Sequence, residues 1–283
     1  MSQIHVRPPA VANMFYPGDV RVLSKGVTDL LERAEPERVR GPIVALICPH
    51  AGYQYSGFTA AHGYKLLIGN EFDSVVIVSP SHREGFEGIS VFNGSAYQTP
   101  LGDLYVDKEI RSALCQNDSM IKESTLGHHN RYPAPQEHAI EVQLPFIQKV
   151  LGDVKITPIV MGIQRREYCF HLGGKLAQVL NGKNVLLIAS SDLSHYHPAQ
   201  EAEALDQVVI RDIDRFDYEQ LMEDLESERG EACGGGPTVA VLIAAKKLGA
   251  DRVTILHHCN SGDVTGDRSA VVGYLSAVAS RTN

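Results

Sequence analysis

The sequence predicts one α/β domain, residues 1–283, with a central β-sheet that is mostly parallel or mixed and is flanked by helices on both faces. Short apolar runs rich in Val and Ile, typical of strands buried on both faces, alternate with segments of helical periodicity. At 283 residues and 43% hydrophobic composition, the chain can bury a full core in a single domain of this kind. We find neither an internal repeat nor a low-complexity linker that would divide it.

Charge and composition argue against several classes of partner. The net charge is −8 with acidic and basic residues interspersed, so there is no basic stripe for nucleic acid. No apolar run approaches the roughly 20 residues that span a bilayer, and the first residues lack the blocks of a signal peptide. We therefore expect a soluble, cytoplasmic protein with no nucleic-acid or membrane partner. Five widely spaced cysteines without a CxxC pair indicate neither a disulfide framework nor a structural zinc knuckle.

The predicted elements follow in a regular order after an irregular arm of residues 1–18. Asp19 can cap a helix whose apolar face comprises Leu23, Val27, Leu30 and Leu31. Strands are expected at 43–48, 74–79, 154–161, 184–189, 252–259 and 270–278. Further helices are expected at 59–68, from 107, at 136–151, at 165–180, twice within 198–228, and at 238–248.

Two local signals modify this order. Asn93 and Gly94 separate two strand-like runs, 88–92 and 95–99, and Asn-Gly in such a position is a strong hairpin signal. Pro145 lies within the helical pattern of 136–151, where it should kink or interrupt the helix.

Three of the predicted strands are each followed by polar residues that include a histidine. These residues are His50 after 43–48, His82 after 74–79, and Asp192 with His195 after 184–189. In an open α/β sheet, ligands bind beyond the carboxyl ends of the strands. We therefore expect these side chains to converge in one polar site at that edge.

His50, His82 and Cys233 are the candidate metal ligands. Imidazole and thiolate suit iron, copper or zinc, whereas magnesium and calcium prefer oxygen ligands. Cys233 precedes three glycines and Pro237, a proline placed in the first turn of a helix. Its thiol should then lie near the positive end of a helix dipole, which favours thiolate. The alternative is that the histidines cap backbone groups and that the cysteine is a small core residue.

Asp192 and His195 are the candidate catalytic residues, because their i, i+3 spacing puts them on one face of a turn or helix start. An aspartate that accepts a hydrogen bond from one ring nitrogen leaves the other nitrogen as a base, so the pair could take a proton from a bound substrate. We expect His195 to lie in the pocket without needing to be a metal ligand, held by Asp192 or by a backbone carbonyl. The alternative is that Asp192 caps a helix and His195 is a bystander.

A third polar group, Glu137, His138 and Glu141, lies in the run QEHAIE. The H-x-x-E spacing lacks the second histidine of a zinc-protease helix, so we interpret these residues as groups that support other side chains or anchor a loop. The chain has no Walker loop, no GxGxxG and no GxSxG, which removes the commonest nucleotide-binding and serine-hydrolase interpretations.

The motifs FYPGD, CPHAGYQYSG, SPSH, EHAIEVQLPFI, SSDLSH and EACGGGP, in this order over nearly the whole chain, resemble those of the Memo family, whose prokaryotic members are called AmmeMemoRadiSam system protein B. The resemblance implies an extradiol-dioxygenase-like fold, similar to class III ring-cleavage enzymes with non-haem iron at one edge of a mixed sheet. It implies that His50 and His82 take the places of the iron-binding histidines and Cys233 that of the carboxylate. It also implies that His195 stands at the acid/base position with Asp192 beside it.

Three functions remain open on this basis. The first is a metal-dependent redox enzyme that holds iron(II) or copper, with zinc as a further candidate, because thiolate is softer and more oxidisable than carboxylate. The second is a binding or adaptor protein that uses the same pocket without chemistry. The third is a metal-free amidase or thiol hydrolase with Cys233 as nucleophile and His195 as base. The expected pocket ligand is a small molecule or a peptide, and the resemblance implies a radical-SAM-type partner protein.

Overall fold

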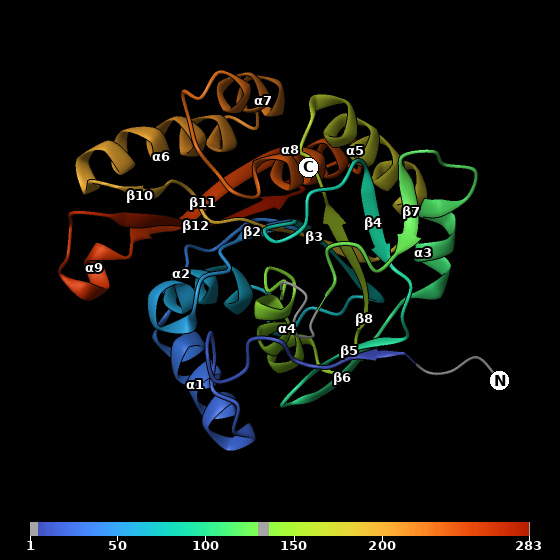
Figure 1. The fold of residues 1–283 in the computed structure, drawn as a ribbon, viewed down its shortest axis with the longest axis horizontal. Helices are drawn as coiled ribbons and strands as arrows, with labels where there is room; N and C mark the ends of the chain where they lie inside the picture. Colours follow the sequence, from blue (N-terminus) through green and yellow to red (C-terminus); the bar gives the residue numbers. More distant parts are fainter. Residues whose placement is uncertain (1–4, 130–135, 283) are drawn as a thin grey trace.

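The computed structural model describes residues 5–129 and 136–282. Within these ranges, one mixed sheet has the strand order β10-β12-β2-β9-β3-β8-β4-β7, with β11 paired to β12 (Figure 1). Its strands are β2 (Ile43–Cys48), β3 (Ser74–Pro80), β4 (Ile89–Phe92), β7 (Ile121–Ser124), β8 (Lys155–Met161), β9 (Val185–Ser190), β10 (His195–His197), β11 (Arg252–Asn260) and β12 (Val271–Ser280). A small sheet contains β1 (Val6–Arg7), β5 (Ala96–Thr99) and β6 (Gly102–Tyr105).

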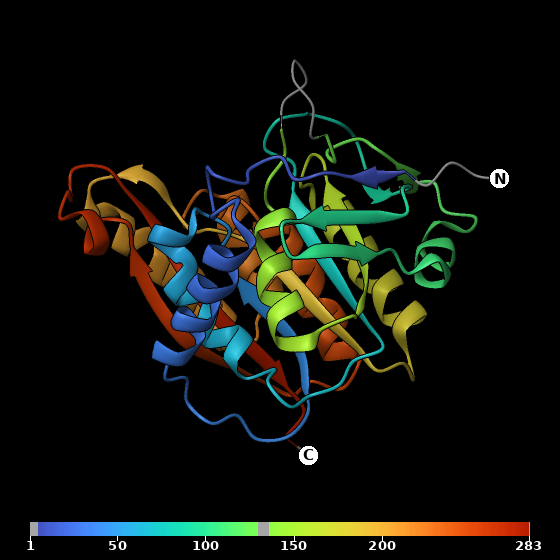
Figure 2. The same cartoon turned by 90° about the horizontal axis from the view of Figure 1, so that it is seen from below.

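Helices cover both faces of the main sheet, as the sequence predicted (Figures 1 and 2). One face packs against α1 (Val20–Arg33), α2 (Tyr53–Lys65) and α4 (Leu144–Leu151). The other packs against α3 (Lys108–Cys115), α5 (Arg166–Leu180), α6 (Ala199–Asp214), α7 (Tyr218–Glu226) and α8 (Gly235–Lys247). In neither described range does a helix have the length and apolar content needed to cross a membrane.

The centre of the sheet determines where the polar residues gather. Strands β2, β9, β3 and β8 are parallel neighbours, while β12 and β4 flank them in antiparallel orientation. All seven residues of β3 and all six of β9 are buried, which explains their continuous apolar sequence. Because β2, β3 and β9 run in the same direction, the residues that follow them meet at one edge of the sheet.

The predicted hairpin across Asn93 and Gly94 is wrong. Strands β4 and β5 both form, but β4 pairs with β7 and β8 in the main sheet, and β5 pairs with β1 and β6 in the small one. The Asn93 main-chain N–H donates to Ser124, and that of Ser95 donates to His5. These contacts with β7 and with the amino-terminal arm separate the two strands and lead the chain from one sheet to the other.

Two helices also differ from their expected bounds. Helix α2 begins at Tyr53, six residues before the expected start, and the Tyr53 N–H donates to the Phe15 carbonyl at 2.7 Å. The helix expected at 136–151 is shorter. A 3₁₀ turn, η1 (Glu141–Gln143), leads into α4, which has Pro145 in its first turn. A proline is tolerated there because its missing N–H has no partner within the helix.

The buried carboxylate of Glu141 anchors the amino-terminal arm, as the loop-anchoring interpretation anticipated. It pairs with Arg7 at 2.7 Å and accepts hydrogen bonds from the main-chain N–H groups of Ala10 and Val11 and from the Tyr16 hydroxyl. Both Arg7 and Glu141 are almost completely buried. The anchored arm brings Phe15 against the ring of His138, with 4.5 Å between ring centroids.

Candidate metal centre

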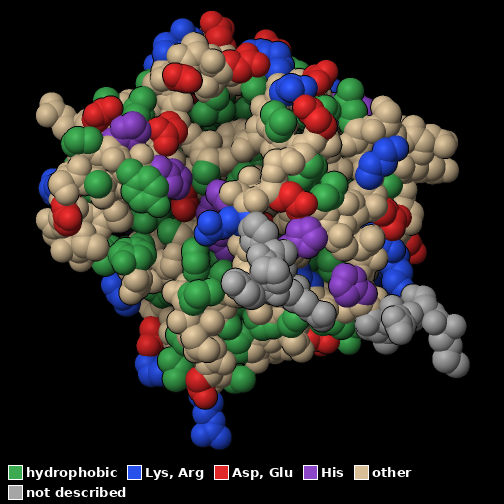
Figure 3. All heavy atoms as spheres, in the orientation of Figure 1, with side chains coloured by type: hydrophobic (Ala, Val, Ile, Leu, Met, Phe, Trp, Pro, Cys, Tyr) green, Lys and Arg blue, Asp and Glu red, His purple; other side chains and the backbone are tan. Residues whose placement is uncertain are grey.

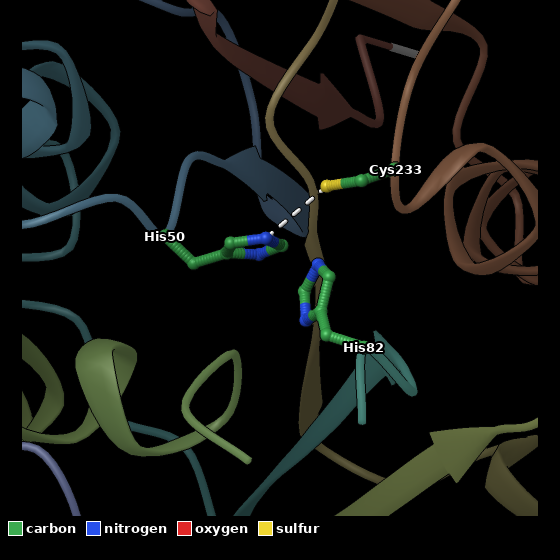
Figure 4. Close-up of side chains that lie close together, drawn as sticks. All are labelled: His50, His82 and Cys233. Carbon is green, nitrogen blue, oxygen red and sulfur yellow. Dashed lines mark hydrogen bonds between the residues drawn. The ribbon is translucent and has the colours of Figure 1, made fainter. Parts of the chain in front are cut away.

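His50, His82 and Cys233 come together at the carboxyl edge of the sheet. His50 follows β2, His82 follows β3, and Cys233 lies in the loop before α8. One potential ligand atom from each residue lies within 4.8 Å of those from the other two. Figure 4 shows the two imidazole rings and the thiol pointing toward one another, with Sγ of Cys233 at 3.2 Å from Nε2 of His50.

Each imidazole is held through its Nδ1 atom. In His50, Nδ1 is 2.9 Å from the hydroxyl oxygen of Ser190. In His82, Nδ1 is 3.0 Å from Oε1 of Glu137, whose other oxygen accepts the main-chain N–H of His82 at 2.6 Å. Such partners fix the ring orientation of metal-binding histidines and leave the second nitrogen free to coordinate. The donor set and its support therefore fit a transition metal ion.

Burial and neighbouring charges favour a neutral His50 and an ionised Glu137, the protonation states that metal binding requires. Burial, together with the neighbouring His82, lowers the pKa of His50 well below its ordinary value, so this imidazole is neutral. Burial opposes ionisation of Glu137, but the hydrogen bond from His82 and its positive potential outweigh burial and lower the pKa of Glu137 to about 2. An ionised carboxylate that accepts a hydrogen bond from one ring nitrogen makes the other nitrogen a stronger metal ligand.

Three glycines let the Cys233 loop pack against the end of β9. A Cβ atom on Gly234 would lie 2.3 Å from the Ser190 carbonyl oxygen, and one on Gly235 would lie 2.6 Å from Leu225. Gln164 ties the loop down, because its Nε2 donates to the Cys233 carbonyl and its Oε1 accepts from Gly236, both at 2.7 Å. The thiol is thus fixed at the edge of the cluster.

The expectation that the α8 dipole favours a Cys233 thiolate is wrong for the protein alone. Burial and then the charge of Asp192 raise the pKa of the Cys233 thiol well above its ordinary value. Desolvation of a thiolate outweighs the partial charge of a helix end at this site. A bound metal cation would supply the missing positive charge, since a coordinating thiol loses its proton.

Asp192 and His195 both border the same pocket, and His195 is held by a backbone carbonyl, the second of its two expected partners, and not by Asp192. Oδ1 of Asp192 accepts the His50 main-chain N–H at 2.7 Å, and Oδ2 lies 3.9 Å from His50 Nε2. The pairing of parallel strands β2 and β9 brings Asp192 beside His50 and explains this preference. His195 Nδ1 is instead 2.8 Å from the Leu193 carbonyl oxygen, and its main-chain N–H donates to Glu231.

The pocket beside the cluster has a volume of about 680 Å³. Polar and aromatic side chains line it together: His50, His82, His138, Asp192, His195, Phe15, Tyr55, Tyr196 and Tyr274. Figure 3 shows several histidine side chains close to a hollow in this face of the molecule. A cavity of this size and mixed character is typical of a small-molecule site.

His138 lines the pocket and Glu137 supports His82, although sequence reasoning assigned neither residue to the pocket itself. The His138 ring stacks on His82, with centroids 4.7 Å apart, and also contacts the ring of Phe15, with centroids 4.5 Å apart. Burial and the nearby His50 lower the pKa of His138 to about 3, so it is neutral. His82, Glu137 and His138 form a second group whose potential ligand atoms lie within 4.8 Å of one another. The density of Glu and His in QEHAIE was the only sequence signal for this arrangement.

Fold and site together define a mixed α/β protein with a histidine and cysteine cluster beyond the ends of its parallel strands. A family model described as "Memo-like protein" matches residues 7–278, and the chain belongs to this Memo family. Proteins named "MEMO1 family protein" from Methanosarcina mazei and Aquifex aeolicus are 40% and 38% identical to it, each over 97% of this chain and 99% of the relative. One from Nitrosopumilus maritimus is 33% identical over 95% of this chain and 98% of its own.

Among solved structures, an uncharacterized protein of Escherichia coli K12 has a similar fold. Its TM-score is 0.50 at 15% sequence identity, and the match covers 84% of this chain and 99% of the other. At this level of identity, the similarity concerns the α/β architecture alone.

Proposed function

We propose that this protein is a metal-binding redox protein that holds iron(II) or copper between His50, His82 and Cys233. One observation carries the proposal: two imidazoles, each held through Nδ1, lie with a cysteine thiol so that all three donor atoms are within 4.8 Å of one another. A single ion in this site would bond to each donor at about 2.0 to 2.3 Å. Zinc accepts the same donors, and we propose iron or copper because a soft, oxidisable thiolate suits a redox site better than an oxygen-activating one.

When bound, iron or copper would supply Lewis acidity and one-electron chemistry. His195 would move protons, because its Nδ1–H donates to the Leu193 carbonyl and leaves Nε2 as the acceptor. Asp192 lies beside His50, and burial raises the pKa of its carboxyl group. Phe15, Tyr55 and Tyr274 would exclude water from the apolar part of a ligand.

The kinship with class III extradiol dioxygenases is part of this proposal, with Cys233 in place of a carboxylate. Replacing a hard oxygen donor by thiolate shifts the site from oxygen activation for ring cleavage toward electron transfer or thiol-linked redox chemistry. A radical-SAM-type protein, implied by the family resemblance, is the proposed partner.

The two alternative functions differ in what they require of Cys233. A thiol hydrolase needs an activated thiol next to its base, yet burial raises the pKa of Cys233, and the imidazole beside it is that of His50. An adaptor that uses the pocket only for binding needs no metal ligand at position 233. The raised pKa of the Cys233 thiol and its contact with His50 support the proposal of a metal ligand over that of a nucleophile.

The test uses protein purified without oxygen or chelator and then loaded with copper(II) or cobalt(II). Both metals give a thiolate-to-metal absorption band when cysteine coordinates. We expect this band in the wild type, its loss in Cys233→Ser, and its retention in Cys115→Ser, a half-buried cysteine outside the site. His195→Ala should keep the metal. A band that persists in Cys233→Ser, or equal loss of metal in His195→Ala and His82→Ala, contradicts the proposal.

A further inference from the structure

Tyr196 has a backbone conformation that tyrosine rarely adopts. Its φ angle is +63°, in the left-handed region that favours glycine. It lies between His195 and His197 in β10, where three residues face two on β12: His195 pairs with Val272 and His197 with Val271. This extra residue is a β-bulge, and glycine is the usual residue at the left-handed position of such bulges.

The bulge itself has a clear structural role. In a regular strand, His195 and His197 would point to the same face. Here His195 borders the metal-site pocket, while His197 pairs with Glu231 at 2.8 Å and with Glu201 at 3.1 Å. The bend therefore directs one histidine into the site and the other away from it. Glycine would make this bend without strain, so the bend does not explain the tyrosine.

The side chain of Tyr196 contributes few contacts to the fold. It is 77% exposed, the highest value among the large apolar side chains in the described ranges. Its hydroxyl forms no hydrogen bond with a described residue, and its ring meets that of His195 edge-on at 5.7 Å. Yet it borders the 680 Å³ pocket beside the metal cluster. Strained residues that persist without structural benefit are typical of functional sites.

We propose that Tyr196 is a ligand-contacting residue, whose ring packs against a planar, unsaturated part of the molecule in the pocket. A rigid ring at the pocket mouth buries such a face at low entropic cost and adds stacking energy. Tyr196 acts in this way only if the pocket takes a ligand, so its role rests on the proposed function. The proposal of a metal centre can be wrong while the proposed contact between Tyr196 and the ligand is right. The experiment therefore tests the two separately.

The first arm measures strain. In Tyr196→Gly, the left-handed backbone becomes unstrained, so Tm should rise. Glu228→Gly is the matched control, because Glu228 has φ +55° and lies outside the metal-site pocket; its Tm should rise as well. A fall in Tm for Tyr196→Gly alone would show that the ring stabilises the fold, which overturns the proposal.

The second arm measures ligand binding with two probes. 4-Nitrocatechol has a planar face and two oxygens for a metal, whereas azide binds a metal without such a face. In cobalt(II)-loaded protein, Tyr196→Gly should weaken 4-nitrocatechol binding about fivefold and leave azide binding unchanged, while Tyr196→Phe stays near wild type. The same loss for 4-nitrocatechol is expected in metal-free protein, where no metal contributes to binding.

The outcomes separate the two proposals. If the wild type does not bind cobalt, the proposal of a metal centre is contradicted. The titration of metal-free protein with 4-nitrocatechol then decides the role of Tyr196. Three results would contradict the proposed role of Tyr196. They are unchanged affinity for 4-nitrocatechol in Tyr196→Gly, equal weakening of both probes in that variant, and no binding of 4-nitrocatechol to either form of the wild type.

Discussion

Glu137 holds His82 at two points: one carboxylate oxygen lies 3.0 Å from the ring Nδ1, and the other accepts the main-chain N–H at 2.6 Å. The same carboxylate accepts the N–H groups of His138 and Ala139. One buried acid thus fixes both the position and the orientation of a proposed metal ligand. This relationship connects the loop before α4 to the end of β3.

Replacing this acid should weaken metal binding without removing a ligand. Glu137→Gln keeps the shape of the side chain but can no longer accept all of these hydrogen bonds. We expect about 10- to 100-fold weaker binding of zinc or cobalt, measured by competition with a chromophoric chelator. Glu226→Gln, which alters an exposed partner of Arg166, is the control and should bind like the wild type. Wild-type affinity in Glu137→Gln would show that His82 needs no such support.

The loop glycines make a steric prediction. In Gly234→Ala, the new methyl group would collide with the Ser190 carbonyl, so the Cys233 loop must shift and metal affinity should fall at least about 10-fold. In Gly174→Ala, on α5, the nearest atom to the new methyl group is the Lys247 amine at 3.9 Å, and no effect is expected. Chelator competition on both variants checks this, and equal affinities would remove the steric role of Gly234.

The buried ion pair of Glu141 and Arg7, which holds the amino-terminal arm, leads to a prediction about stability. Glu141→Gln leaves the buried Arg7 guanidinium without its counter-ion, so unfolding free energy should drop by about 3 to 5 kcal/mol in urea titrations. Glu226→Gln breaks an exposed pair with Arg166 and should cost less than about 1 kcal/mol. Similar losses in the two variants would mean that the buried pair does not hold the arm.

Buried His128 should make the fold sensitive to acid. Burial and the nearby Arg7 charge lower its pKa from 6.5 to about 3 in the folded state. Its contribution to stability is therefore present above about pH 6.5 and is lost as pH falls toward 3, because only the unfolded chain binds the proton readily. The wild type should lose up to about 4 kcal/mol over this range through His128.

His128→Gln removes this titration, so its unfolding free energy should fall less steeply with acid than that of the wild type. Urea unfolding at a series of pH values measures both curves. Parallel curves would show that His128 does not carry the acid sensitivity.

Much of the architecture follows from strand pattern alone. The runs that end before His50, His82 and Asp192 are continuous and apolar because β2, β3 and β9 are buried on both faces, so their carboxyl ends and the residues beyond them could be placed from the sequence. Cys233 could be added because its glycines and Pro237 mark the start of α8. The role of these residues as metal ligands remains a prediction.

The contacts that depend on tertiary packing could not be predicted from the sequence. The Asn93-Gly94 signal was outweighed by hydrogen bonds to β7 and to the arm. His195 was expected to be held by Asp192 or by a backbone carbonyl, and the sequence could not decide between them. Asp192 accepts the main-chain N–H of His50 from the neighbouring strand end, and His195 is held by the Leu193 carbonyl. Glu137 lies 55 residues from His82 in sequence, so local spacing could not reveal their contact.

The most direct test of the proposed metal centre is X-ray absorption at the metal edge of zinc-loaded protein. The proposal predicts one sulfur at about 2.3 Å with nitrogen ligands at about 2.0 Å, and a sulfur contribution that disappears in Cys233→Ser. A wild-type spectrum with nitrogen and oxygen neighbours but no sulfur would contradict it.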